Sequence, residues 1–135
     1  MDEAVIVIML KDKETGFLDK ELGCYKVPEY ENLIYNTYAV DDNGKIKVFM
    51  KITTDRDVSD WEFEAVYDYY DTETILPFVT SIAEEEDCYN PTWIVSFDFV
   101  DDIDFMEEKI SEILKAHHEE LISVYETISD KRDEY

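Results

Sequence analysis

The middle of this sequence contains no lysine and no arginine. Residues 57–108 carry seventeen Asp and Glu and no basic residue, which gives this segment a formal charge of −17 within a chain of −23. Soluble protein surfaces normally intersperse both signs. Because binding to phosphates needs Lys and Arg, we expect no direct contact with nucleic acid and none with an anionic membrane surface.

Glycine, proline and cysteine are also scarce. Three Gly and three Pro among 135 residues exclude a low-complexity protein, while 45% apolar and 14% aromatic residues can form a real core. Cys24 and Cys88 lie far apart and fit no metal or redox spacing. We therefore expect one domain over residues 1–135 in the cytoplasm, with two reduced thiols; a single disulfide between them is the alternative.

Long apolar runs are missing as well. No stretch approaches the roughly 20 apolar residues that cross a bilayer. The apolar run at residues 4–10 follows Met1-Asp2-Glu3, an acidic start where a secretory signal would be basic. Its β-branched residues predict a central strand that is buried on both faces.

Several later segments carry strand signals. Residues 22–27 form a short run that ends before Pro28. In residues 93–99, Trp93, Val95, Phe97 and Phe99 recur at every second position, which predicts a last strand. Residues 33–40 and 45–54 flank an Asn43-Gly44 pair. Because a type I′ turn needs positive φ at both central residues, this pair predicts a tight hairpin.

Residues 61–70 carry two conflicting patterns. Trp61 and Phe63 begin an alternation with acidic residues that predicts a strand with an acidic outer face. Ser59 and Glu62 instead have the capping-box spacing of a helix start. Aromatic enrichment favours the strand, which we adopt as the prediction.

Two segments have helical spacing. Residues 75–83 predict a short helix, with Thr72 or Thr74 as its cap and Pro77 in its first turn. A long C-terminal helix should follow a cap at Asp101, Asp102 or Asp104. Its apolar stripe comprises Met106, Ile110, Ile113, Leu114, His117, Leu121, Val124, Tyr125 and Ile128.

The predicted fold is α+β. We expect an antiparallel meander sheet of about five or six strands, with one short helix and one long C-terminal helix packed on a face.

No catalytic or cofactor motif is present. The adjacent His117 and His118 would point about 100° apart on a helix and cannot share a metal ion; we expect His117 at the helix surface, beside the core stripe. The turn at Asn43-Gly44 resembles part of a calcium loop, but Ala39 and Met50 would occupy the positions that need oxygen ligands. We expect no enzyme activity, no cofactor and no metal site.

Four aspartates support an alternative to a non-catalytic protein without metal. A magnesium or calcium site, in a metal-binding protein or a metal-dependent enzyme, would be centred on Asp98, Asp101, Asp102 and Asp104. Helix capping and a solvated loop explain these residues better.

The acidic middle segment supports the leading functional hypothesis, a non-catalytic module that binds a basic protein. In size and charge alone the chain is similar to small DNA-mimic inhibitors and to acidic immunity proteins that neutralise basic nucleases. The alternative is a housekeeping domain whose acids only solubilise it, and a homodimer through the C-terminal helix is a further expectation. The predicted contact residues are Asp60, Glu62, Glu64, Asp68, Tyr70, Glu84, Glu85, Glu86, Asp87 and Tyr89.

A chain of charge −23 is destabilised by its own repulsion. The Debye length falls from about 10 Å at 0.1 M to about 3 Å at 1 M ionic strength, so sodium chloride should screen exposed carboxylates from one another. We expect the melting temperature, followed by circular dichroism, to rise between low and moderate salt. A flat or falling curve would mean that pairing already neutralises these charges.

Overall fold

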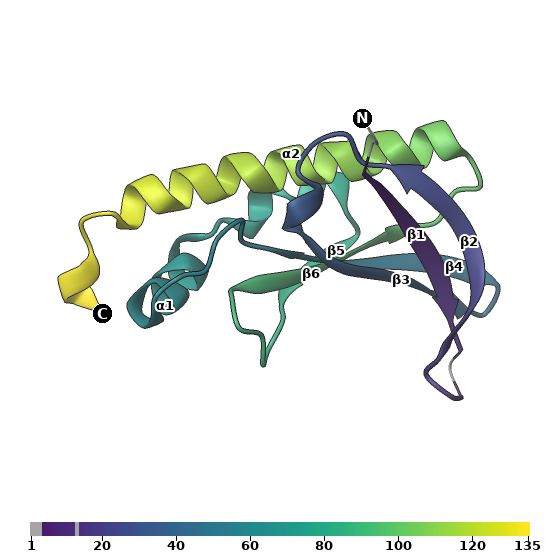
Figure 1. Cartoon of the computed structure of the whole chain (residues 1–135), viewed down its shortest axis with the longest axis horizontal. Helices are drawn as coiled ribbons and strands as arrows, with labels where there is room; N and C mark the ends of the chain where they lie inside the picture. The colour runs from purple at the N-terminus through teal and green to yellow at the C-terminus, as the bar shows by residue number, and fades with distance from the viewer. Residues whose placement is uncertain (1–3, 13) are drawn as a thin grey trace.

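The computed structural model describes residues 4–12 and 14–135 and has an α+β fold (Figure 1). Its strands are β1 (Val5–Lys11), β2 (Leu18–Lys26), β3 (Ile34–Asp42), β4 (Lys45–Thr53), β5 (Ser81–Glu84) and β6 (Thr92–Asp98). Its helices are α1 (Asp60–Tyr69) and the long α2 (Ile103–Ile128), with short 3-10 turns η1 (Glu31–Leu33), η2 (Thr72–Thr74), η3 (Leu76–Phe78) and η4 (Arg132–Glu134).

The six strands form one sheet in the order β2-β1-β3-β4-β6-β5. The α+β class, the strand number and the long C-terminal helix are confirmed. The sheet is mostly antiparallel, but β1 and β3 run parallel, with Leu10 opposite Ala39. This pair is not part of a simple meander. It arises because β2 folds back to the outer edge, so the chain returns past β1 and adds β3 on its other side.

Strand β1 forms where the apolar run predicts it, but it is not covered on both faces. Ile8 is fully buried, whereas Val5 and Val7 on the opposite side are 51% and 41% exposed. Helix α2 lies along one side of the sheet (Figure 1). The continuous apolar run therefore serves two different faces, and only one of them is in the core.

The strand predicted for residues 61–70 is wrong, because this segment is helix α1. The capping box decides the conformation: the Ser59 backbone N–H donates to Glu62 Oε1 at 3.0 Å, which satisfies an otherwise unpaired donor at the helix start. Ala65 and Val66 become the buried side of the helix. A period-2 alternation of only ten residues was a weaker signal than the cap.

The short helix predicted for residues 75–83 is also wrong. The turns η2 and η3 are followed by β5, which pairs antiparallel with β6. Pro77 lies at the start of η3 and has no N–H to extend a helix from its interior. Of the acidic residues 84–87, Glu84 therefore ends strand β5, and the other three begin the loop from β5 to β6.

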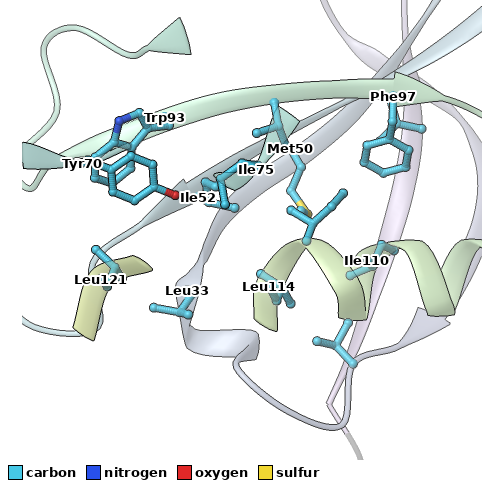
Figure 2. Close-up of a cluster of buried hydrophobic side chains, with 14 of the residues drawn as sticks. Leu33, Met50, Ile52, Tyr70, Ile75, Trp93, Phe97, Ile110, Leu114 and Leu121 are labelled. Atoms are coloured by element: carbon cyan, nitrogen blue, oxygen red, sulfur yellow. The ribbon is translucent and has the colours of Figure 1, made fainter. Parts of the chain in front are cut away.

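Helix α2 supplies most of the helical side of the core. Asp102 is its N-cap and accepts a hydrogen bond from the Phe105 N–H at 3.0 Å. Every residue of the predicted stripe except Tyr125 is buried. The stripe packs on the inner face of the sheet, where Met50, Ile52 and Phe97 point toward the helix (Figure 2).

The hairpin between β3 and β4 is confirmed. Asn43 and Gly44 form the turn with φ of 55° and 90°, and the Gly44 N–H donates to Asp41 Oδ1 at 2.7 Å. An added Cβ at Gly44 would meet no atom within 4 Å. The requirement for glycine is therefore one of backbone conformation and not of space.

Replacing Gly44 by valine should lower stability by about 1–3 kcal/mol, because β-branched residues resist positive φ. Gly44→Asn is the matched control and should cost much less, since Asn tolerates this region. Urea denaturation of the three proteins measures the difference. Equal loss in both variants would contradict the conformational explanation.

Candidate functional site: an acidic groove beside the first helix

A hollow of about 340 Å³ lies between α1 and the loop that joins β5 to β6. We call it the acidic groove. It is lined by Phe63, Tyr67, Glu84, Glu85, Glu86 and Asp87.

Hydrogen bonds hold the two walls of the groove together. The Tyr67 hydroxyl donates to the Thr92 carbonyl oxygen at 3.1 Å and accepts from the Thr92 N–H at 2.9 Å. Asn90 in the loop accepts from the Val58 N–H at 3.2 Å and donates to Asp57 Oδ1 at 2.9 Å. At the other end of the loop, the Tyr67 hydroxyl also lies 3.2 Å from the Glu85 carbonyl oxygen. Both ends of the loop are thus fastened to the α1 region, and the groove is preformed.

The groove combines an aromatic wall with a carboxylate wall. The Phe63 and Tyr67 rings meet edge to face with centroids 5.3 Å apart. Tyr67 packs against the hydrophobic core. Glu85 is partly neutralised by Lys51, with Nζ and Oε2 3.8 Å apart. Glu84, Glu86 and Asp87 are exposed.

Residues 84–87 are the predicted contact residues that the fold brings together in one groove. Tyr89 follows them and is 82% exposed. Asp60 and Glu64 are exposed on α1, on a helix and not on the outer face of a strand. Asp68 accepts a hydrogen bond from the Tyr135 hydroxyl at 2.7 Å, which ties it to the C-terminal turn.

Glu62 has a structural role in this arrangement. It caps α1 and forms an ion pair with Arg56, with Nη2 and Oε2 2.9 Å apart. The hydrogen bond from Arg56 lowers the pKa of Glu62 to about 2. The Arg56 guanidinium also lies 4.4 Å from the centre of the Tyr125 ring. Charge reversal at Glu62 would therefore damage the fold before it could report on binding.

Tyr70 is buried and cannot contact a partner in this fold. It is 7% exposed and stacks on Trp93, with ring centroids 4.1 Å apart (Figure 2). Its hydroxyl lies 2.8 Å from His117 Nδ1, and His117 Nε2 lies 2.7 Å from the Thr53 carbonyl oxygen. Because a carbonyl only accepts, Nε2 carries the hydrogen and Nδ1 accepts from Tyr70.

His117 is fully buried, so the prediction of a surface histidine is wrong. Burial is the main reason why its pKa falls to about 4, since a charged imidazole loses its hydration there. Both ring nitrogens of the neutral form have partners. His118 instead stacks on Tyr30 with centroids 4.2 Å apart.

The sequence prediction missed Phe63 as a site residue. The strand assignment placed its side chain in the core-facing set, whereas on the helix it lines the groove. The Ser59–Glu62 capping box was the signal that could have found it.

Two of the four aspartates of the alternative site have separate structural roles. Asp102 caps α2, and Asp98 pairs with Lys45 at 3.4 Å. Among residues 4–12 and 14–135, no group of three His, Cys, Asp or Glu side chains is arranged to hold a metal ion.

A larger hollow of about 540 Å³ lies beside α2. Its lining mixes charges and includes Phe78, Lys115 and Glu120. Glu120 already accepts a hydrogen bond from the Asp71 N–H at 2.8 Å, and burial raises its pKa. The wall is mainly the solvent side of one helix, and it brings together no nucleophile and base.

Fold and groove together define a small acidic α+β protein with an aromatic and carboxylate-lined recess. The chain belongs to a family described as "Family of unknown function (DUF6762)", whose model matches residues 1–135. Neither the comparison with curated proteins nor that with solved structures found a match. Within the part of the chain that the structure describes, no helix is long and apolar enough to cross a membrane.

Stability should fall as the pH falls below neutral, because the pKa of His117 is lower in the folded state (about 4) than in the unfolded chain (about 6.5). Only the unfolded state takes up this proton in that window. Between about pH 7.5 and about pH 5.5 the loss should be about 1.3 kcal/mol.

Urea denaturation at both pH values measures this loss. His117→Gln should be less stable than the wild type at the higher pH, but its free energy of unfolding should not show the loss that protonation of His117 causes between the two pH values. His118→Gln should show the same loss as the wild type. An unchanged slope in His117→Gln would assign the pH dependence to other groups.

Proposed function

We propose that this protein is a cytoplasmic, non-catalytic binding module whose acidic groove takes a lysine or arginine side chain of a basic protein partner. The observation that carries the proposal is the pairing of two aromatic side chains with four consecutive acidic residues around one preformed recess. One suitable partner class is a nuclease, whose basic cleft ordinarily holds phosphates and would accept carboxylates in their place.

The chemistry of the groove suits an amphipathic cation. The methylene groups of Lys or Arg can pack along Phe63 and Tyr67 while the charged end reaches the carboxylates. Attraction between a cation and an aromatic ring adds about 0.5–1 kcal/mol at an exposed site. An anion or a purely apolar ligand would leave the carboxylates unpaired.

The surrounding charge supports a basic partner at longer range. Segment 57–108 carries −17, and a field of one sign accelerates the encounter with a partner of the opposite sign. Steering of this kind acts mainly on the association rate and weakens with salt. The groove would then supply the short-range contacts that slow dissociation.

A lysine decamer peptide is a suitable probe, measured by surface plasmon resonance. The variant Glu84→Gln/Glu86→Gln/Asp87→Asn removes three charges at nearly constant shape, and Asn tolerates the positive φ of 63° at position 87. We expect its affinity to fall about tenfold, as three charge contacts of about 0.5 kcal/mol each would give.

The matched control Glu119→Gln/Glu126→Gln/Asp130→Asn removes the same charge from exposed positions elsewhere. It should change affinity less than about twofold, because it alters only the distant field. Phe63→Leu should keep an apolar wall but lose the aromatic contact, and should weaken binding about threefold. Equal losses in the two triple variants would show that only net charge matters and would reject the groove.

A further inference from the structure

The side of the sheet turned away from α2 is a second distinctive surface, which we call the open face. In the strand register Tyr38 lies opposite Phe49, and Val40 lies opposite Lys47. These positions alternate along the strands with residues such as Ala39, Val48 and Met50, which are fully buried against the helix layer. The open face therefore carries the other half of each strand's side chains.

An apolar stripe crosses the middle of the open face. Its aromatic centre is the stacked pair Tyr38 and Phe49, with ring centroids 5.4 Å apart. At one side Val5 and Val7 are 51% and 41% exposed. Contiguous apolar surface of this kind marks an interaction site more often than scattered single residues do. The stripe comprises Val5, Val7, Met9, Tyr38, Val40, Phe49 and Ile94.

The charges of the open face are nearly balanced, unlike those of the rest of the chain. Five lysines stand against three carboxylates, a formal charge of +2 in a chain of −23. Lys45 pairs with Asp98 at 3.4 Å, and Lys11 Nζ lies 5.0 Å from the centre of the Tyr38 ring. The charged residues are Lys11, Lys26, Lys45, Lys47, Lys51, Glu21, Asp42 and Asp98.

We propose that the open face is the interface of a homodimer, in which two copies pack their sheets face to face about a twofold axis. Two chains of −23 repel each other, so they can approach closely only through a surface without excess negative charge. The open face meets that condition. A basic partner would find no excess of carboxylates on the open face, and a strongly acidic partner would find only a small positive charge. A second copy, which presents the same apolar stripe and the same mixture of charges, suits the chemistry of the face better.

A twofold interface must be complementary to itself. The open face has an apolar middle and margins that carry both Lys and Asp side chains. Lys47 lies opposite Asp98 in the register, so each copy presents a cation and an anion to the other. An apolar centre with a polar rim is also the usual anatomy of a protein interface.

The size of the face is sufficient. Six strands about 4.8 Å apart and about seven residues long, at about 3.3 Å per residue, span roughly 29 by 23 Å, or about 660 Å² in projection. A side-chain surface exceeds its projection, and a standard interface buries about 800 Å² per partner. The stripe of α2 offers no comparable surface, because its residues are buried within the chain.

Sedimentation velocity from micromolar to submillimolar protein tests the proposal. We expect a dimer whose dissociation constant falls as salt screens the repulsion between copies. Phe49→Glu places a charge at the centre of the stripe and should weaken the dimer at least about tenfold. Should this variant lose its circular dichroism signal, Val7→Glu, at a more exposed position, provides the same test.

Ile122→Glu is the control, because Ile122 is 45% exposed on the opposite layer, in α2. It should leave the dimer intact. A wild-type protein that stays monomeric would overturn the proposal. So would a dimer that is broken by Ile122→Glu but not by Phe49→Glu, and so would a dimer whose affinity falls as salt is added. None of these outcomes bears on the acidic groove, which the peptide experiment tests separately.

Discussion

The buried hydrogen-bond chain from Tyr70 through His117 to the Thr53 carbonyl fastens together three elements that lie far apart in sequence. It joins the end of α1, the middle of α2 and the end of β4. Trp93 closes it from the sheet side, with its ring 4.1 Å from Tyr70 and 5.5 Å from His117. A buried imidazole is tolerated only while both nitrogens are paired, so these three elements are held in one arrangement. The position of α1, and with it the acidic groove, depends on that arrangement.

The scarcity of cations determines where each one is used. Arg56 lies between Glu62 and the Tyr125 ring, and it thereby connects the cap of α1 to α2. Lys51 reaches from the sheet to Glu85 at the edge of the groove. Among the described residues near the groove, Arg56 and Lys51 therefore already pair with carboxylates that support its walls. Glu84, Glu86 and Asp87 remain exposed. An external cation would find these carboxylates accessible.

Sequence patterns predicted the elements whose signals are local and strong. The Asn43-Gly44 turn and the long stripe of α2 form as expected, and β1 forms where its apolar run predicts it, although only one of its faces is in the core. The failures came where two local signals competed, as at residues 61–70, or where helical spacing coincided with short turns, as at residues 75–83. The burial of His117 and Tyr70 could not be predicted, because their hydrogen-bond partners lie 47 and 64 residues apart in sequence. The groove was predicted only in part: its carboxylates form a run, whereas Phe63 joins them only through the geometry of a helix.

The separation of charge over the molecule follows from the two-residue period of its strands. In β4, Lys45, Lys47 and Lys51 alternate with Val48, Met50 and Ile52, which are all fully buried. Burial of one set places the lysines together on the other face. The acids at 84–87 lie largely beyond the end of β5, where no such alternation constrains them, and they gather beside α1. The same chain consequently presents a nearly neutral apolar face and a strongly acidic flank. Two surfaces of such different charge suit two different kinds of contact. Salt should strengthen association through the nearly neutral face, because it screens the repulsion between copies, and should weaken association of a basic partner with the acidic flank.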